Sequence, residues 1–304
     1  MLRSFPVSAV LALALSCVAA VGFAGSLEPN LKLLSDSAAG ASLPIEVRSQ
    51  SSGGHLQGTV VSEVDLAFPV VADALARVSS WCELLPLHLN VKACVHGRTA
   101  SGESLVIFIG RKFYREPDDA YRLEFDFSVR SSSTRLELVL HSEGGALGAR
   151  DCTLELSAEP RGDRTRLQLD FSQQYGVLAR VGLASYLRTL GRSKVGFSQE
   201  RNPRGRLVPV GGASGMIERN AVRYHLAVQA HLETLEVDSS FRNERAAARW
   251  FELTQAWPAQ LFELERDVYL DNKRRELANQ LRLQAAATRS EADRALAARA
   301  GELD

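Results

Sequence analysis

The stretch that decides the fold is residues 121–173, and it reads YRLEFDFSVRSSSTRLELVLHSEGGALGARDCTLELSAEPRGDRTRLQLDFSQ. Within it, apolar and polar side chains alternate in four segments that begin near Tyr121, Leu136, Cys152 and Leu167. Successive side chains of a β-strand point to opposite faces, so each segment is predicted to be a strand with one apolar and one polar face. Short connections that contain Ser, Gly or Pro favour antiparallel pairing of neighbouring strands. The sequence therefore predicts a curved meander whose apolar face must be covered by another part of the chain.

The residues before this stretch predict one strand, a helical segment and two more strands. Alternation over residues 59–68 indicates the first strand, and Pro69 suits the first turn of a helix. Apolar residues at helical spacing then continue as far as Pro86. Two further alternating segments, 87–96 and 105–109, lead into the meander. The predicted order is one strand, a helical excursion and six antiparallel strands.

The residues after the meander predict helices. Residues 177–192 have a loosely helical pattern, and the six glycines and two prolines of residues 191–215 indicate a loop. A continuous apolar stripe from Ile217 to Leu235 predicts a long amphipathic helix. The chain ends in a tail with apolar residues at helical spacing, which becomes rich in Arg, Glu and Ala towards its end.

The first residues have the pattern of a secretory signal peptide. Arg3 precedes an apolar stretch over residues 7–23, and the small residues Gly22 and Ala24 stand where a signal peptidase cuts. A retained membrane anchor is the alternative interpretation of the same stretch. The signal pattern predicts an exported protein, either periplasmic or secreted.

The sequence divides into four parts. They are a signal peptide (1–24), a flexible leader (25–56), one domain (57–236, with an insertion at 176–214) and a helical tail (237–304). After cleavage three cysteines remain, namely Cys82, Cys94 and Cys152. A bridge between Cys82 and Cys94 is one alternative, and a set of small buried apolar side chains is the other.

The order of predicted elements resembles a known superfamily. The passage VDLAFP at 64–69, the helix end WCELLP at 81–86 and the closing helix from Met216 carry the resemblance, which covers residues 57–236. The superfamily is the START and polyketide-cyclase-like group (SRPBCC, Bet v 1-like). The resemblance implies an α+β helix-grip fold, with a curved antiparallel sheet of about seven strands wrapped on a long C-terminal helix. It also implies an apolar ligand cavity between the sheet and that helix.

The inward faces of the predicted strands are almost wholly apolar. An apolar pocket with a few polar groups suits a protein that binds a lipid-like molecule without catalysis. A core filled completely by side chains is the alternative. Tyr224 or His231 is expected to orient a hydroxyl or carboxyl group of the ligand. The residues predicted to contact it are Tyr121, Phe125, Phe127, Leu169, Phe171, Tyr224, Val228 and His231.

No catalytic, cofactor or metal motif stands out in the sequence. His88 and His96 lie on one face of a predicted strand, about 26 Å apart, which is too far to share a metal ion. That face is expected to be a polar outer face. An enzyme of the cyclase or hydratase kind remains an alternative, with His231 as base and Tyr175 or Tyr224 as proton donor.

Composition and patterning give the expected partners. The chain of 304 residues has a formal net charge of zero and no nucleic-acid-binding motif, which disfavours nucleic acid. Residues 177–194 mix leucines with four basic residues, and they are expected either to touch an anionic membrane or to cover the cavity mouth. Trp250 and Trp257 belong to an apolar stripe of the tail. The stripe is expected to pack on the domain, and a protein partner, self-association or an envelope role through the tail is the alternative.

Overall fold

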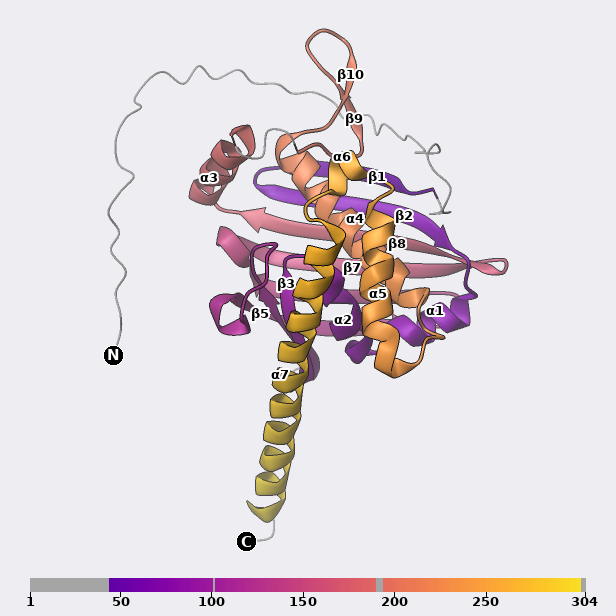
Figure 1. Ribbon diagram of the computed structural model, residues 1–304, viewed down its shortest axis with the longest axis vertical. Helices are drawn as coiled ribbons and strands as arrows, with labels where there is room; N and C mark the ends of the chain where they lie inside the picture. Colours follow the sequence, from indigo (N-terminus) through magenta and orange to yellow (C-terminus); the bar gives the residue numbers. More distant parts are fainter. Residues whose placement is uncertain (1–43, 101, 190–193, 302–304) are drawn as a thin grey trace, which may run out of the picture.

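A large antiparallel sheet forms the centre of the protein (Figure 1). The computed structural model describes residues 44–100, 102–189 and 194–301, so the predicted signal peptide and residues 25–43 of the predicted leader lie outside the described residues. The sheet has eight strands in the order β1-β2-β8-β7-β6-β5-β4-β3. Its strands are β1 (Glu46–Ser52), β2 (His55–Val64), β3 (Val91–Thr99), β4 (Gly102–Ile109), β5 (Tyr121–Ser131), β6 (Leu136–Gly144), β7 (Ala149–Arg161) and β8 (Arg164–Tyr175).

Helices fill the connections and cover the sheet. Between β2 and β3 lie α1 (Phe68–Leu75), α2 (Val78–Leu84) and the 3-10 turn η1 (Leu85–Leu87). Two more 3-10 turns, η2 (Pro117–Asp119) and η3 (Ala146–Gly148), precede β5 and β7. After β8 come α3 (Val177–Arg188), the hairpin β9 (Gln199–Arg201) and β10 (Leu207–Pro209), α4 (Gly212–Leu232), α5 (Ser239–Thr254), α6 (Pro258–Leu261) and α7 (Arg266–Gly301).

The predicted meander is confirmed, and its register aligns one apolar row across four strands. Phe127 pairs with Leu140, Leu140 with Leu154, and Leu154 with Phe171. β8 then pairs with β2, which places the start of the predicted domain beside the last strand of the meander. Because paired residues of neighbouring strands face the same side, this row forms a continuous apolar surface.

Helix α4 covers the apolar surface and is itself buried on both sides. Gly58 on β2 permits this approach, since a Cβ there would lie 2.9 Å from the carbonyl oxygen of Ile217. On the opposite side of α4, the indole of Trp250 on α5 donates to the carbonyl of Arg223 at 3.0 Å. Arg223 and Glu218 on α4 are therefore buried between this helix and its neighbours. Sheet and helix together have the helix-grip arrangement that the sequence predicts.

Two predictions about irregular segments are wrong. Residues 46–52, predicted to belong to a flexible leader, form the edge strand β1, so the sheet has eight strands rather than about seven. Part of the predicted loop at 191–215 forms the β9–β10 hairpin. Both segments are short and rich in Ser, Gly or polar residues. The strand structure of β1 depends on pairing with β2, and that of β9 on pairing with β10.

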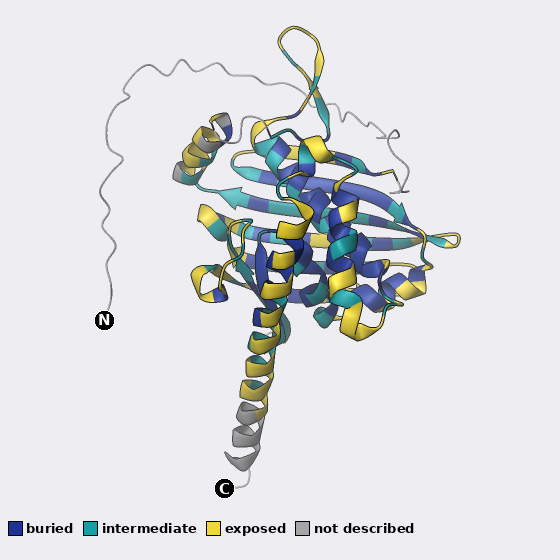
Figure 2. Cartoon of the chain, in the orientation of Figure 1, coloured by how far each residue is buried: buried dark blue, intermediate teal, exposed yellow. Residues whose placement is uncertain are grey.

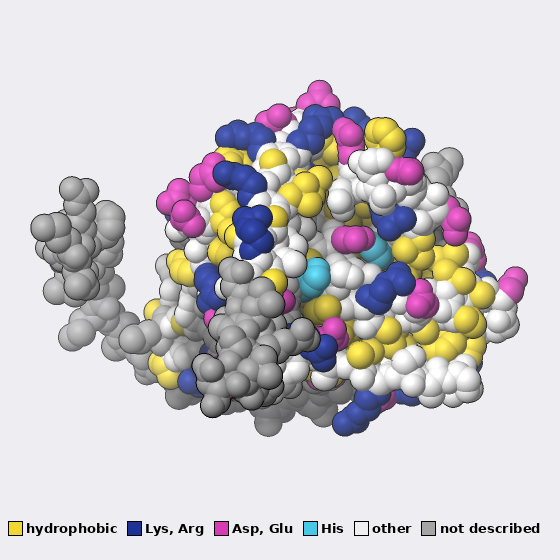
Figure 3. All heavy atoms as spheres, turned by 90° about the horizontal axis from the view of Figure 1, so that it is seen from below, with side chains coloured by type: hydrophobic (Ala, Val, Ile, Leu, Met, Phe, Trp, Pro, Cys, Tyr) yellow, Lys and Arg dark blue, Asp and Glu magenta, His cyan; other side chains and the backbone are white. Residues whose placement is uncertain are grey.

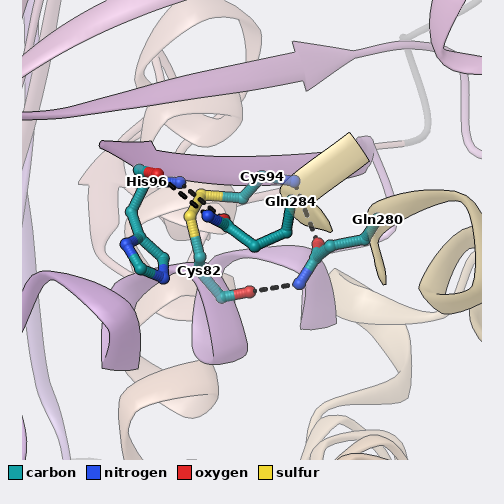
Figure 4. Close-up of a disulfide and its surroundings, with 5 residues drawn as sticks. All are labelled: Cys82, Cys94, His96, Gln280 and Gln284. Carbon is teal, nitrogen blue, oxygen red and sulfur yellow. Dashed lines mark hydrogen bonds between the residues drawn. A yellow bond between two sulfur atoms is a disulfide. The ribbon is translucent and has the colours of Figure 1, made fainter. Parts of the chain in front are cut away.

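The tail packs on the domain through α5 and α7, and α7 runs beside the edge strand β3 (Figure 1). The side chain of Gln284 both accepts from the backbone N–H of His96 at 3.0 Å and donates to its carbonyl at 3.1 Å. Gln280 accepts from the N–H of Cys94 at 2.9 Å, as Figure 4 shows. Four residues of helix rise about 6 Å and two residues of strand about 6.7 Å, so side chains at every fourth helical position can follow alternate strand residues.

The prediction of a polar outer face on β3 is wrong, because the helical tail covers this face. Lys92 is fully buried, and its ammonium lies 2.8 Å from the carboxylate of Glu276 on α7. Lys273 contacts the other carboxylate oxygen of Glu276 at 2.7 Å. His88 is buried in the turn before β3. Figure 2 shows that the upper part of α7 carries buried residues and that the described residues below it, as far as Ala292, are exposed or half-buried.

The cysteine alternatives are resolved in favour of a disulfide between Cys82 and Cys94 (Figure 4). It joins α2 to β3, and their Cα atoms lie 4.9 Å apart. Gln280 binds on both sides of it, since its amide also donates to the carbonyl of Cys82 at 2.7 Å. Cys152 is a free, buried thiol. The disulfide and α7 therefore fix the same edge of the sheet.

Candidate ligand-binding site

The inner face of the sheet has two ends, and one of them carries the partly exposed aromatic residues described below. We call it the mouth end. There β4 finishes beside the start of β5, with Ile109 opposite Tyr121, and β8 finishes beside the start of β7, with Tyr175 opposite Ala149. The turn η3, helix α3 and the turn before β3 all connect to strands at this end.

The middle of the interface between sheet and α4 is closed. Leu169 on β8 and Val228 on α4 are completely buried. Phe125 and Phe127 are buried as well. All four were predicted to contact ligand, and they lie in a region packed as densely as a protein core.

At the mouth end, aromatic side chains of the same inner face keep accessible surface. Phe171 on β8 and Tyr224 on α4 are only partly buried, and their ring centroids lie 5.2 Å apart. The other side of the Tyr224 ring stacks on His88, with centroids 4.6 Å apart. Leu123 and Ile109 also face this region and are partly buried. The structure thus brings together two predicted ligand residues, Phe171 and Tyr224, with His88, which the sequence had placed on the polar face.

His88 presents a buried donor to this region. Its Nδ1 accepts from the backbone N–H of Asn90 at 3.1 Å, so in the neutral ring Nε2 carries the proton. Burial lowers the pKa of His88 well below its ordinary value, and the charges of Arg223, Lys273 and Lys92 lower it further. The ring is therefore neutral near pH 7.

The Nε2 atom of His88 has no hydrogen-bond partner within the described part of the chain. Asn220, one turn before Tyr224 on α4, is close enough to favour the charged form of the ring, but no hydrogen bond with good geometry joins them. A buried N–H without an acceptor costs about 1–3 kcal/mol, which an oxygen atom of a ligand would offset. No sequence signal marks His88 except its place just after Pro86, ahead of the first residue of β3.

The other polar groups near the mouth end are neutral at pH 7. Gln173 donates to the hydroxyl of Tyr175 at 3.0 Å. Burial raises the pKa of Tyr175 to about 12 and that of the Cys152 thiol to about 11. Burial also raises the pKa of Tyr224. These groups can donate or accept hydrogen bonds, but none of them is an ionised nucleophile at that pH.

His231 lies at the other end of α4. It is seven residues from Tyr224, so about 10 Å of helix separates them, and the predicted base and donor do not meet. Its Nδ1 lies 3.7 Å from a carboxylate oxygen of Glu83. Burial lowers the pKa of His231 to about 4, and the charges of Arg242 and Arg77 act in the same direction. A surface hollow of about 450 Å³ between α1 and the α4–α5 turn is lined by those two arginines.

Exposed apolar side chains surround the mouth end. Tyr121, predicted to face inward, is 52% exposed because it is the first residue of its strand. Leu147 in η3 is 75% exposed, and Val177 and Val181 on α3 are 67% and 66% exposed. Leu147 has φ 58°, a left-handed conformation that a leucine rarely adopts and that occurs often at functional sites. We call Tyr121, Leu147, Val177 and Val181 the apolar rim.

Metal binding and membrane spanning find no support in the described residues. Among them, no group of three or more His, Cys, Asp or Glu side chains could hold a metal ion. None of the helices in the described part of the chain is long and apolar enough to cross a bilayer.

Comparisons with known proteins give likenesses in structure only. No family model matches the chain, and no curated protein matches it. A STAR-related lipid transfer protein from Xanthomonas axonopodis is 9% identical with a TM-score of 0.39, and the match covers 67% of this chain and 99% of that one. Human STARD10 is 10% identical with a TM-score of 0.34, covering 53% and 69%. Norcoclaurine synthase from Thalictrum flavum is 14% identical with a TM-score of 0.33, covering 47% and 89%.

These values assign no residue and no activity to the chain. The likeness to these solved structures is one of overall structure and assigns no family to the chain. The fold itself is evident from the order of the strands and the position of α4.

Proposed function

We propose that this chain is an exported protein that binds a lipid-like hydrophobic molecule at the mouth end and does not act on it chemically. One observation carries the proposal. Phe171 on the sheet and Tyr224 on α4 keep accessible surface where these two elements face each other, while Leu169 and Val228 beside them are completely buried. An aromatic surface of this kind at the end of a closed core suits a hydrophobic group.

A polar group of the ligand is recognised by His88 and Tyr224. The Nε2–H of His88 is buried and has no acceptor among the described residues, and the neutral hydroxyl of Tyr224 can donate or accept. A hydroxyl or carbonyl oxygen beside the stacked rings satisfies both. Both groups are neutral at pH 7, and they can bind an uncharged polar group of the ligand.

The apolar rim supports uptake of the ligand from a membrane. Leu147, Val177 and Val181 are large apolar side chains that water surrounds in the free protein. Burying them in the interfacial layer of a bilayer is favourable, as for other interfacial segments. The predicted membrane contact through residues 177–194 is in this way extended to η3.

Export is supported by the disulfide between Cys82 and Cys94. Such bonds persist in oxidising compartments and are rare in the cytosol. The signal pattern of the first 24 residues points to the same compartment.

The experiment is native mass spectrometry of protein purified from its own host, followed by denaturing extraction and a lipid uptake panel. We expect a discrete extra mass that is released as a lipid. In the variant Phe171→Asp, a carboxylate would face the apolar part of the ligand, and binding should weaken by at least 100-fold.

The control variant is Val129→Asp. Val129 is also a partly buried residue of the inner face, but it lies on β5, three strands away from Phe171 on β8. Its variant should bind as the wild type does. An empty wild-type protein that takes up no lipid from the panel, or equal loss of binding in both variants, would contradict the site.

A further inference from the structure

The β9–β10 hairpin projects away from the body of the protein (Figure 1). Its tip is a turn that is held by side-chain hydrogen bonds. The side-chain oxygen of Asn202 accepts from the backbone N–H groups of Arg204 at 2.9 Å and Arg206 at 3.1 Å. Gly205 has φ +73°, a conformation that favours glycine. The turn therefore presents the residues on either side of Gly205 in a fixed arrangement.

The base of the hairpin is anchored in the core. The carboxylate of Glu218 on α4 is completely buried and accepts from the N–H groups of Phe197 at 2.6 Å and Ser198 at 3.0 Å. It also accepts from the hydroxyls of Ser198 and, at 2.7 Å, Ser49 on β1. Several hydrogen bonds to one buried carboxylate hold the two strands at a defined angle to α4.

The insertion that contains the hairpin carries charge of one sign. Residues 176–214 include seven Lys and Arg and one Glu, a formal charge of +6. The remaining residues have 29 basic and 35 acidic side chains and carry −6, so the chain as a whole is neutral. The face at the opposite end of the molecule mixes acidic and basic side chains around histidines (Figure 3). The excess of positive charge is thus carried by this one segment of the sequence.

Three arginines of the hairpin are exposed, namely Arg201, Arg204 and Arg206. The guanidinium of Arg201 donates to the carbonyl of Gly205 at 2.9 Å, and no ion pair involves these three side chains within the described residues. Leu207, the next residue, is 50% exposed. Basic side chains next to an apolar one are typical of segments that lie at the surface of an anionic bilayer.

We propose that the β9–β10 hairpin binds the surface of an anionic lipid bilayer through Arg201, Arg204, Arg206 and Leu207. The inference rests on the proposed function and names the membrane from which ligand is taken. A membrane fits better than an acidic protein, because Leu207 is an exposed apolar side chain next to the three arginines, and Val177 and Val181 are exposed on α3. Both α3 and the base of the hairpin contact α4. The hairpin supplies attraction to lipid phosphates, and the rim supplies apolar contact.

The experiment is co-sedimentation of the full chain with vesicles of phosphatidylcholine alone or with one part in three of phosphatidylglycerol. We expect binding only to the vesicles that contain phosphatidylglycerol, and weaker binding as salt is added. Each basic side chain near an anionic surface contributes about a fivefold gain in partitioning, so the triple variant R201Q/R204Q/R206Q should lose about 100-fold.

The matched control is R98Q/R130Q/R161Q. It removes the same charge from exposed arginines near the last residues of β3, β5 and β7, at the end of the sheet opposite the mouth. Vesicle binding of this variant should stay within a few-fold of the wild type. Equal loss in both variants, wild-type binding by the hairpin variant, or binding that does not depend on phosphatidylglycerol would overturn the proposal.

Native mass spectrometry of the hairpin variant separates this proposal from the proposed function. The variant should still retain lipid when lipid is added in solution. A wild-type protein that binds the anionic vesicles through the hairpin but never carries a lipid would refute the carrier function and leave the hairpin assignment standing.

Discussion

The buried ion cluster between β3 and α7 predicts a large effect from a small substitution. Lys92 and Glu276 are 0% and 2% exposed at their side chains, and Lys273 is 8% exposed. Each ammonium also donates to backbone carbonyls, Lys92 to that of Leu89 and Lys273 to those of His88 and Val91. The single carboxylate therefore balances two ammonium groups that are removed from water.

In the variant Glu276→Gln, both lysines lose this partner without a change of side-chain shape. Breaking a buried ion pair by removing one member costs about 3–5 kcal/mol, because the remaining charge stays buried. For a domain of this size, that loss lowers the melting temperature by about 10 °C. We expect this result at pH 7 in thermal and urea denaturation followed by circular dichroism.

The dependence on pH tests the cause. Burial lowers the pKa of Lys273 to about 8, against the opposing effect of Glu276. Between pH 8 and the ordinary lysine value of about 10.4, the unfolded chain binds more protons than the folded one, so the free energy of unfolding rises with pH. A neutral lysine no longer needs the carboxylate, and the difference between wild type and variant should shrink from pH 7 to pH 10.

The control is Glu244→Gln, which breaks the pair of Glu244 on α5 with Arg274 on α7. The two side chains are 57% and 59% exposed, and such surface pairs contribute at most about 1 kcal/mol. If Glu276→Gln costs no more than Glu244→Gln at pH 7, or if its cost does not change up to pH 10, the reasoning from burial is refuted.

Two further predictions concern the disulfide and one carboxylate. The double variant C82A/C94A should lose about 3 kcal/mol of unfolding free energy, as expected for a bridge across 12 positions, and an unchanged urea midpoint would count against this. For Glu263, burial would raise the pKa, but the hydrogen bond from Lys194 and the charge of Arg223 outweigh it, and the pKa is lowered. The contribution of Glu263 to the free energy of unfolding is therefore present above the ordinary carboxyl pKa of about 4.3. It is lost as pH falls through the pKa that Glu263 has in the folded protein. Glu263→Gln should cost about 2 kcal/mol at pH 7 and nothing near pH 2 in urea denaturation, and a cost that persists in acid would exclude this cause.

The fold was predictable where a local pattern decides it. Strict alternation in β5 to β8 and the stripe on α4 are each encoded within one segment, so their positions and faces follow from the sequence. Strand β1 and the hairpin were missed because their structure comes from contacts with β2, Glu218 and each other.

The candidate site was predictable only in part. Phe171 and Tyr224 lie at the mouth end as core-facing aromatic residues should, but alternation does not tell which part of an apolar face is closed and which is open. His88 and Lys92 were assigned to a polar face because the pattern of β3 carries no information about α7, a helix almost 200 residues further along the chain that covers this face. Their neutral or paired state follows from that distant contact.

The pairing of α7 with β3 limits how copies of this protein can associate. An edge strand can form hydrogen bonds with another chain through its unpaired backbone N–H and C=O groups. On β3, the side chains of Gln280 and Gln284 already bind the backbone groups of Cys94 and His96. Within the described residues, β1 is therefore the edge strand whose outer backbone groups are left for another chain. Two copies that joined through β1 would form a symmetric pair with both outer borders blocked by α7. Edge-to-edge growth of folded copies would then end at a dimer, and a fibre could not propagate.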